Sequence, residues 1–265
     1  MGKIIVITTN KGGTGKTTIA SNLACSLSMN NKKVILIDID PQCGINFEFG
    51  KDWNYSHRKT IINVAMNEIK LSDAIISANE NLDLLLSDIN LNNYDQLKLR
   101  NSNIEFNIKD IIKFLKDNYD YVIIDTAPQI SSLNKICLEL SDITLIPYEL
   151  EQKSIAGAIA IISKLNEINP KSFNLLILNK CRINWIANEV RYSKVEKEIQ
   201  NEFSNWVEQN SNNTIFSQAK MINSSQFKNI IFKKQLPLIT ISSNSKIYEK
   251  PKKCINDLMN IIINI

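Results

Sequence analysis

One stretch near the start of the chain constrains its fold more than any other: residues 8–18, with the sequence TTNKGGTGKTT. An apolar run at residues 4–7 precedes it, and a helical pattern at residues 19–24 follows. The order of strand, glycine-rich turn and helix is the setting that a phosphate-binding loop requires. The sequence therefore predicts such a loop in preference to an ordinary glycine-rich turn.

The loop offers three kinds of contact to a nucleotide. Backbone N–H groups of its glycines and of the first helical turn form a positive cup for an anion. Lys16 adds a charge for the outer phosphates, and the Thr17 hydroxyl is placed to ligate Mg²⁺. The predicted nucleotide-binding residues of the loop are Lys11, Gly12, Gly13, Thr14, Gly15, Lys16, Thr17 and Thr18.

Carboxylates follow two other apolar runs. Asp125 ends one of them and is predicted to hold Mg²⁺ directly or through water. Asp38 and Asp40 stand two residues apart where another run ends, and side chains at that spacing on a strand point to the same side. Both are therefore expected near the metal and the attacking water. The predicted metal ligands are Thr17, Asp40 and Asp125.

Strand and helix patterns alternate along the chain. Continuous apolar strands imply a mostly parallel twisted sheet with helices on both faces, and ligands bind at the carboxyl ends of such strands. We expect an α/β P-loop NTPase fold in one domain, residues 1–265, and a loop at residues 43–60. Strands are predicted at 4–7, 34–37, 82–86, 121–125, 143–147 and 175–179, and helices at 61–67, after 73, at 108–115 and at 151–166.

Composition excludes some classes of protein. The five cysteines form no C-x-x-C pair and His57 is the only histidine, so the cysteine and histidine spacing of a zinc-type metal site is absent. The net charge of +4 permits a nucleic-acid partner. No apolar run approaches the ~20 residues that span a bilayer. The chain also opens with a strand pattern, which is unlike a signal peptide, so we expect a cytoplasmic protein.

The loop departs from the common G-x-x-x-x-G-K-[ST] pattern, because Asn10 stands at the first glycine and Lys11 lies inside the loop. The form K-G-G-x-G-K-T-T resembles the deviant Walker A motif of the ParA/MinD superfamily of ATPases. The D-x-D-P-Q sequence at residues 38–42 resembles ParA partition proteins more than MinD. Without an extension before the loop, the chain is similar to the small, Soj-like ParA type. The resemblance covers residues 3–180 and, more loosely, the rest.

This resemblance implies an ATPase that uses ATP and Mg²⁺, is weak alone and is stimulated by a ParB-type centromere-binding protein. The implied catalytic residues are Lys11, Lys16 and Asp40. Lys11 would reach across an ATP-dependent homodimer to the partner's nucleotide, and Asp40 would orient water. Asp38 and Thr126 would act as switch residues, with Thr126 sensing the γ-phosphate.

The resemblance also implies contacts to the base. Asn179 would pair with a purine edge, and Pro237 would lie near it, although the glycine that usually precedes the Lys-Pro segment is missing. Pro147, Glu151 and Gly157 fit a family pattern that we interpret as structural and interfacial.

The second half of the chain carries a basic stretch. No acidic residue stands between Glu208 and Glu249. Small ParA proteins bind double-stranded DNA non-specifically through a basic surface in this half, and phosphate contacts need no base readout. A solvated lysine face is the alternative; the DNA reading predicts association with the nucleoid. The candidate DNA-binding residues are Arg182, Arg191, Lys194, Lys197, Lys220, Lys228, Lys233 and Lys234.

Two other functions stay open at this point. A MinD-like membrane-cycling ATPase would need a C-terminal amphipathic helix with basic residues on its polar face. Residues 254–265 are amphipathic, but their polar residues are three asparagines and one aspartate, so we expect this helix to pack on the sheet and expect no membrane partner. The other is a nucleotide-gated scaffold that hydrolyses ATP negligibly without its partner. DNA-binding and liposome-binding assays with ATP separate the first two readings.

Overall fold

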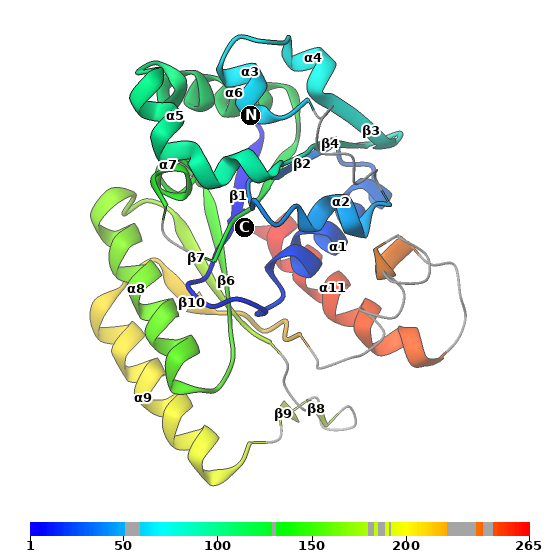
Figure 1. The fold of residues 1–265 in the computed structure, drawn as a ribbon. Helices are drawn as coiled ribbons and strands as arrows, with labels where there is room; N and C mark the ends of the chain where they lie inside the picture. The colour runs from blue at the N-terminus through cyan, green and yellow to red at the C-terminus, as the bar shows by residue number, and fades with distance from the viewer. Residues whose placement is uncertain are drawn as a thin grey trace.

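An eight-stranded sheet forms the centre of the computed structural model, with the strand order β10-β7-β6-β1-β5-β2-β4-β3 (Figure 1). Every pairing in it is parallel except that of β3 with β4. The model describes residues 1–50, 59–128, 131–179, 183–184, 189–190, 192–221, 237–240 and 246–265. The strands are β1 Lys3–Ile7, β2 Val34–Asp38, β3 Ile75–Asn79, β4 Leu82–Leu85, β5 Tyr121–Asp125, β6 Ile143–Tyr148, β7 Phe173–Leu178 and β10 Thr214–Phe216, with a separate hairpin of β8 Ile183–Asn184 and β9 Glu189–Val190.

Helices cover both faces of the sheet, so the expected α/β P-loop architecture is confirmed. One face packs against α3, α6, α7, α8 and α9, and the other against α1, α11 and η3. The helices are α1 Lys16–Met29, α2 Gly44–Glu48, α3 Ile61–Ala65, α4 Leu71–Ala74, η2 Ile89–Asn93, α5 Tyr94–Arg100, α6 Ile104–Asn118, α7 Ser132–Leu140, α8 Gln152–Ile168, α9 Lys194–Asn210, η3 Leu238–Thr240 and α11 Lys246–Asn264.

The expected loop at residues 43–60 contains a short helix, so that prediction is wrong at its start. Cys43 takes a left-handed conformation, φ 53°, and α2 begins at Gly44 directly after it. Ile45 is fully buried in the core, and this burial stabilises a helix too short to form alone. Residues 51–58 lie outside the described part of the chain.

The predicted C-terminal helix packs inside the molecule, as expected. In α11, Ile255, Leu258 and Ile262 are fully buried on the face of the sheet that α1 covers, and Figure 1 shows the two helices together. The Ser26 hydroxyl of α1 donates to Asn256 Oδ1 at 3.1 Å. None of the helices that the structure describes is long and apolar enough to cross a membrane.

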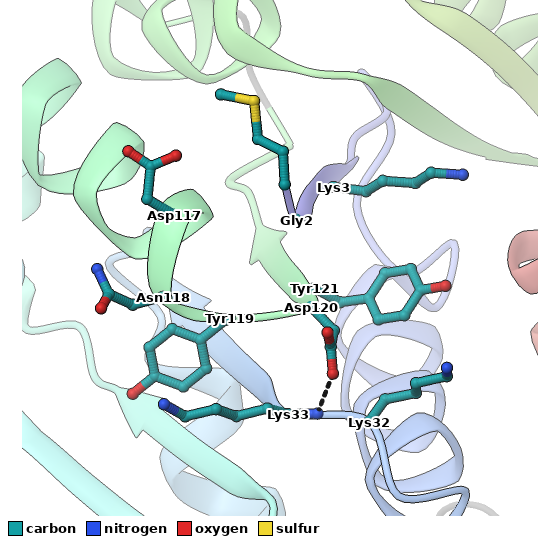
Figure 2. Close-up of a pocket in the computed structure, with 10 residues that line it drawn as sticks. Gly2, Lys3, Lys32, Lys33, Asp117, Asn118, Tyr119, Asp120 and Tyr121 are labelled. Atoms are coloured by element: carbon teal, nitrogen blue, oxygen red, sulfur yellow. Dashed lines mark hydrogen bonds between the residues drawn. The ribbon is translucent and has the colours of Figure 1, made fainter.

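A cavity of about 350 Å³ opens where the strands start (Figure 2). Lys3 at the beginning of β1 and Tyr121 at the beginning of β5 line it. The cavity therefore lies at the amino ends of these strands, whereas the phosphate loop lies at the carboxyl end of β1. The Lys33 backbone N–H donates to Asp120 Oδ2 at 2.8 Å, and the Lys33 ammonium lies 4.8 Å from the centre of the Tyr119 ring. Parallel sheets bind ligands at their carboxyl ends, so we place the candidate site elsewhere.

Candidate functional site

The phosphate loop connects β1 to α1 through backbone conformations that favour glycine. Gly13 and Gly15 have φ angles of 73° and 83°, in the left-handed region. Gly15 is the N-cap of α1, and a Cβ atom there would stand 2.7 Å from the amide nitrogen of Asn179. The glycines therefore let the loop pass close to the end of β7 and point the N-terminus of α1 at the centre of the site.

Lys16 begins α1 and is buried, with 6% of its surface exposed. Burial lowers the pKa of its ammonium group, and the charges of Asp125 and Asp40 oppose that shift. Two carboxylates therefore already face the cation that is predicted to hold phosphate. This places the predicted cradle and two predicted metal-site residues in one location.

Asp125 lies at the end of β5, in register with Ile7 of β1 and Asp38 of β2. Its Oδ2 accepts a hydrogen bond of 2.6 Å from the Thr17 hydroxyl. Its Oδ1 is buried and has no hydrogen-bond partner among the residues the structure describes. Burial raises the pKa of Asp125 to about 7, against the opposing effects of Thr17 and Lys16. An orphaned carboxylate oxygen at this point is what a bound cation would satisfy.

The donor set fits Mg²⁺. A hydroxyl and a carboxylate supply oxygen ligands, and Mg²⁺ commonly takes its other ligands from water and substrate phosphates. Within the described ranges, no group of three or more His, Cys, Asp or Glu side chains forms an all-protein metal site. A Mg²⁺ ion here would thus depend on the nucleotide for part of its coordination.

Asp38 and Asp40 have different roles, although the spacing predicted a shared side. Asp38 Oδ1 accepts from the Asp40 N–H at 2.9 Å and Oδ2 from the Ile45 N–H at 3.1 Å, so Asp38 holds the backbone after β2. Asp40 lies beyond the strand end, and its Oδ1 accepts from the Gln42 N–H at 2.9 Å. Burial raises the pKa of both carboxyls; nearby Asp125 raises that of Asp38 further, and Lys16 lowers that of Asp40. Of these two carboxylates, Asp40 is the one whose pKa the charge of Lys16 in the phosphate cradle lowers.

Gly44, the first residue of α2, packs directly on Thr17. A Cβ atom at position 44 would stand 2.9 Å from Thr17 Cγ2 and 3.0 Å from its hydroxyl oxygen. The backbone of α2 therefore forms one wall around the predicted metal ligand.

Gly44→Ala is expected to displace the Thr17 hydroxyl and weaken binding of Mg²⁺–ADP about tenfold, or about 1.4 kcal/mol. Titration with a fluorescent ADP analogue measures the loss. Binding of the same analogue in EDTA is the internal control and should change much less. An equal loss with and without Mg²⁺ would show that the glycine acts on the whole loop and not on the metal ligand.

Lys11 makes ion pairs within its own chain. Its ammonium lies 3.3 Å from Glu149 Oε2 and also contacts Glu151, both in the connection between β6 and α8. These contacts, led by the hydrogen bond to Glu151, raise the pKa of Lys11. In the single chain Lys11 is thus bound to two carboxylates. Its reach across a dimer stays a prediction.

The predicted base-reading residue contacts the phosphate loop. Asn179 follows β7, and its amide N–H donates to the Thr14 backbone oxygen. The structure therefore gives this side chain a role in holding the loop, and its contact to a purine stays a prediction.

Thr126 lies close to the end of β1, and Pro237 directly precedes η3, which contacts α1. The Thr126 hydroxyl is buried and donates to the Ile7 backbone oxygen at 2.9 Å. Pro237 is buried just before η3, where the Ile239 N–H donates to Asn22 Oδ1 of α1 at 3.0 Å. η3 therefore packs against the middle of α1. The sensing role of Thr126 and the base contact of Pro237 stay predictions.

Two residues of the predicted interfacial pattern make contacts within the single chain. Gly157 of α8 packs against it, since a Cβ atom there would stand 3.2 Å from Asn10 Cβ. Pro147 lies within β6, paired with Ile177 of β7. Both contacts are structural within the single chain.

The candidate DNA-binding residues are only partly described. Lys194 and Lys197 are exposed on α9, which carries four glutamates beside them, and Lys220 is half-buried. α9 by itself is therefore not a basic surface. The other candidates lie outside the described residues: Arg182, Arg191, Lys228, Lys233 and Lys234.

Sequence reasoning missed one buried charge near the site. Glu48 ends α2, is 5% exposed and is hydrogen bonded to Thr18 and Ser21 of α1. It stands in a stretch expected to be a loop, where no periodicity indicates burial.

Residues 2–178 match a family model described as an AAA domain. A ParA family protein of Mycoplasma genitalium is 29% identical over 259 residues, which cover 92% of each chain. The match thus extends well beyond the phosphate loop.

Two solved structures share the fold. The ATP complex of a Cyanothece McdA variant has a TM-score of 0.78 at 22% identity, covering 100% of this chain and 97% of that one. A plasmid partition protein from Borrelia burgdorferi bound to AMPPNP has a TM-score of 0.75 at 22% identity, covering 98% and 100%. Both were solved with an adenine nucleotide or its analogue.

Proposed function

The chain belongs to the ParA/MinD superfamily of P-loop ATPases, and from this membership we propose that it is an ATP-dependent DNA-partition protein. In this proposal an ATP-bound homodimer binds double-stranded DNA without sequence preference. ATP hydrolysis, stimulated by a ParB-type centromere-binding protein, releases the DNA. One observation carries the proposal. Lys16 and Thr17 of the phosphate loop lie together with Asp125, and the same loop contains Lys11, the residue that departs from the common motif.

Phosphoryl transfer requires positioning and charge compensation more than covalent chemistry. The loop N–H groups and Lys16 would hold the β- and γ-phosphates, and Asp40, next to Lys16, would orient the attacking water. Thr17 and Asp125 would hold Mg²⁺. That ion supplies charge neutralisation at the phosphate oxygens when bound.

Lys11 would complete the site of a second chain. It must leave Glu149 and Glu151 before it can reach a partner's phosphate. The partner's phosphate then receives a charge that a single chain does not supply. ATP binding, dimerisation and hydrolysis thereby become coupled steps.

The chain should bind duplex DNA well only as an ATP dimer, because two rigidly joined copies double the phosphate contacts at high effective concentration. Lys233→Ala combined with Lys234→Ala should weaken binding on every sequence alike. It should also flatten the salt dependence, whose slope is about −0.9 per phosphate neutralised. Mobility shifts with ATP and with ADP, over a range of salt concentrations, measure both effects.

Anionic liposomes are the comparison arm of the same experiment. In α11, Ile255, Leu258, Met259 and Ile262 are buried in the core, so these apolar side chains are not available to a membrane, whereas Ile263 is 37% exposed. If the wild type with ATP shifts no DNA at low salt yet sediments with the liposomes, the partition proposal fails and a MinD-like membrane cycle replaces it.

A further inference from the structure

The short helix α2 joins the Asp38–Asp40 segment to the phosphate-loop helix. Figure 1 shows α2 beside α1, and their residues are in contact. Gly44 packs on Thr17, and Glu48, one helical turn later, bonds to Thr18 and Ser21. Residues four apart lie on the same helix face, so one face of α2 rests on the start of α1.

Glu48 makes the polar half of this contact. It is 5% exposed, and its carboxylate accepts a hydrogen bond of 3.2 Å from the Thr18 hydroxyl and another from the Ser21 hydroxyl. The Ser21 hydroxyl also lies 2.9 Å from the backbone oxygen of Thr17. Burial raises the pKa of Glu48 to about 7, while the two hydroxyls oppose the shift. Burying a carboxylate costs free energy that an apolar side chain would not cost, which points to a positional role for Glu48.

The other end of α2 is hydrogen bonded to the Asp38–Asp40 segment. The Cys43 N–H donates to the Asp40 backbone oxygen at 2.9 Å, and the Ile45 N–H donates to Asp38 Oδ2 at 3.1 Å. A shift of α2 along α1 would therefore move Asp40 relative to Lys16. Errors of about 1 Å in such a site can reduce rates about a hundredfold.

We propose that Glu48 is a positioning residue for ATP hydrolysis: it fixes α2 on α1 and so holds Asp40 in place beside the phosphate cradle. The inference rests on the proposed ATPase function. It assigns to Glu48 an effect on turnover and leaves nucleotide binding to the loop and Lys16.

Two substitutions at position 48 test this. Glu48→Leu fills the space but removes both acceptors, and it should lower kcat at least about tenfold while ADP affinity stays within about threefold of wild type. Glu48→Gln keeps an acceptor oxygen and should retain kcat within about threefold. Phosphate release with ATP, Mg²⁺ and DNA gives kcat, and a fluorescent ADP analogue gives the affinity.

Ser21→Ala extends the test to the other side of the contact. It should lower kcat by a smaller factor, and adding it to Glu48→Leu should lower kcat no further, because both changes remove one interaction. Asp88→Asn is the matched control: Asp88 is also 5% exposed and accepts from the Asn90 N–H at 2.6 Å at the start of η2. This control should keep the wild-type kcat, even if thermal unfolding shows lower stability.

The outcomes separate the two proposals. If the wild type turns over ATP and Glu48→Leu has the same kcat, the Glu48 assignment alone is overturned. Equal losses in Glu48→Gln and Glu48→Leu, or in Asp88→Asn, also overturn it. A wild type that neither binds the ADP analogue nor turns over ATP under these conditions overturns the proposed function and, with it, the assignment.

Discussion

Lys16→Ala is expected to lower the affinity for ATP by at least about a hundredfold. Truncating one partner of a buried charge cluster typically costs about 2–5 kcal/mol, and a hundredfold loss corresponds to about 2.7 kcal/mol. Lys16 is buried beside Asp40 and Asp125, so its removal leaves two carboxylates facing the phosphates without compensation. Calorimetric titration with ATP and Mg²⁺ measures the loss. Lys164→Ala, which removes a lysine paired with Glu167 far along the chain, is the matched control.

Asp40→Ala should behave differently, and the contrast makes the prediction specific. It removes the proposed water-orienting group but none of the phosphate contacts. We expect ATP binding and dimerisation to persist while turnover falls at least about a hundredfold, which would trap the ATP dimer. Equal losses of ATP affinity in Asp40→Ala and Lys16→Ala would mean that Asp40 holds the loop and does not orient water.

Lys11→Ala is expected to abolish the ATP-dependent dimer. Wild type should sediment at twice the monomer mass with ATP and Mg²⁺, and as a monomer with ADP. The variant should stay monomeric with either nucleotide and should hydrolyse ATP negligibly, because the partner's phosphate lacks its added charge. Analytical ultracentrifugation and phosphate release measure the two effects.

The control for this experiment is Lys153→Ala, which removes an exposed lysine of α8 and should dimerise normally. The reading of Lys11 as a residue that acts across a dimer is wrong if Lys11→Ala still forms the dimer and turns over ATP at the wild-type rate. Its contacts to Glu149 and Glu151 would then be its whole role.

The parts of the site that the sequence predicts are those that local order determines. A glycine-rich loop between a strand and a helix must place Lys16 and Thr17 at the helix start, and a strand that ends in Asp125 must place that carboxylate at the same sheet edge. The structure brings these three side chains together, with Thr17 and Asp125 in direct contact.

Contacts between distant segments could not be read in the same way. Lys11 meets residues 149 and 151, and Asn179 meets Thr14, through the packing of separate strands and loops. Glu48 stands in a stretch with no apolar period, so only the docking of α2 on α1 shows that it is buried.

Some elements of the fold were missed for similar physical reasons. β10 has three residues and exists through its pairing with β7. The helix expected after residue 73 is wrong: the four-residue α4 ends at Ala74 and passes directly into β3, an antiparallel edge strand with partly exposed residues. Short edge elements carry little periodicity, so their type depends on tertiary contacts.

The docking of α11 on α1 joins two segments that are far apart in the chain. α1 leaves the ribosome early, yet Ile255, Leu258 and Ile262 cover it only after translation has passed residue 262. During synthesis the helix that carries Lys16 therefore lacks one of its walls. A nascent chain gains this wall only after residue 262 has been made, so chains that stop before α11 should compete poorly for nucleotide or for a partner subunit.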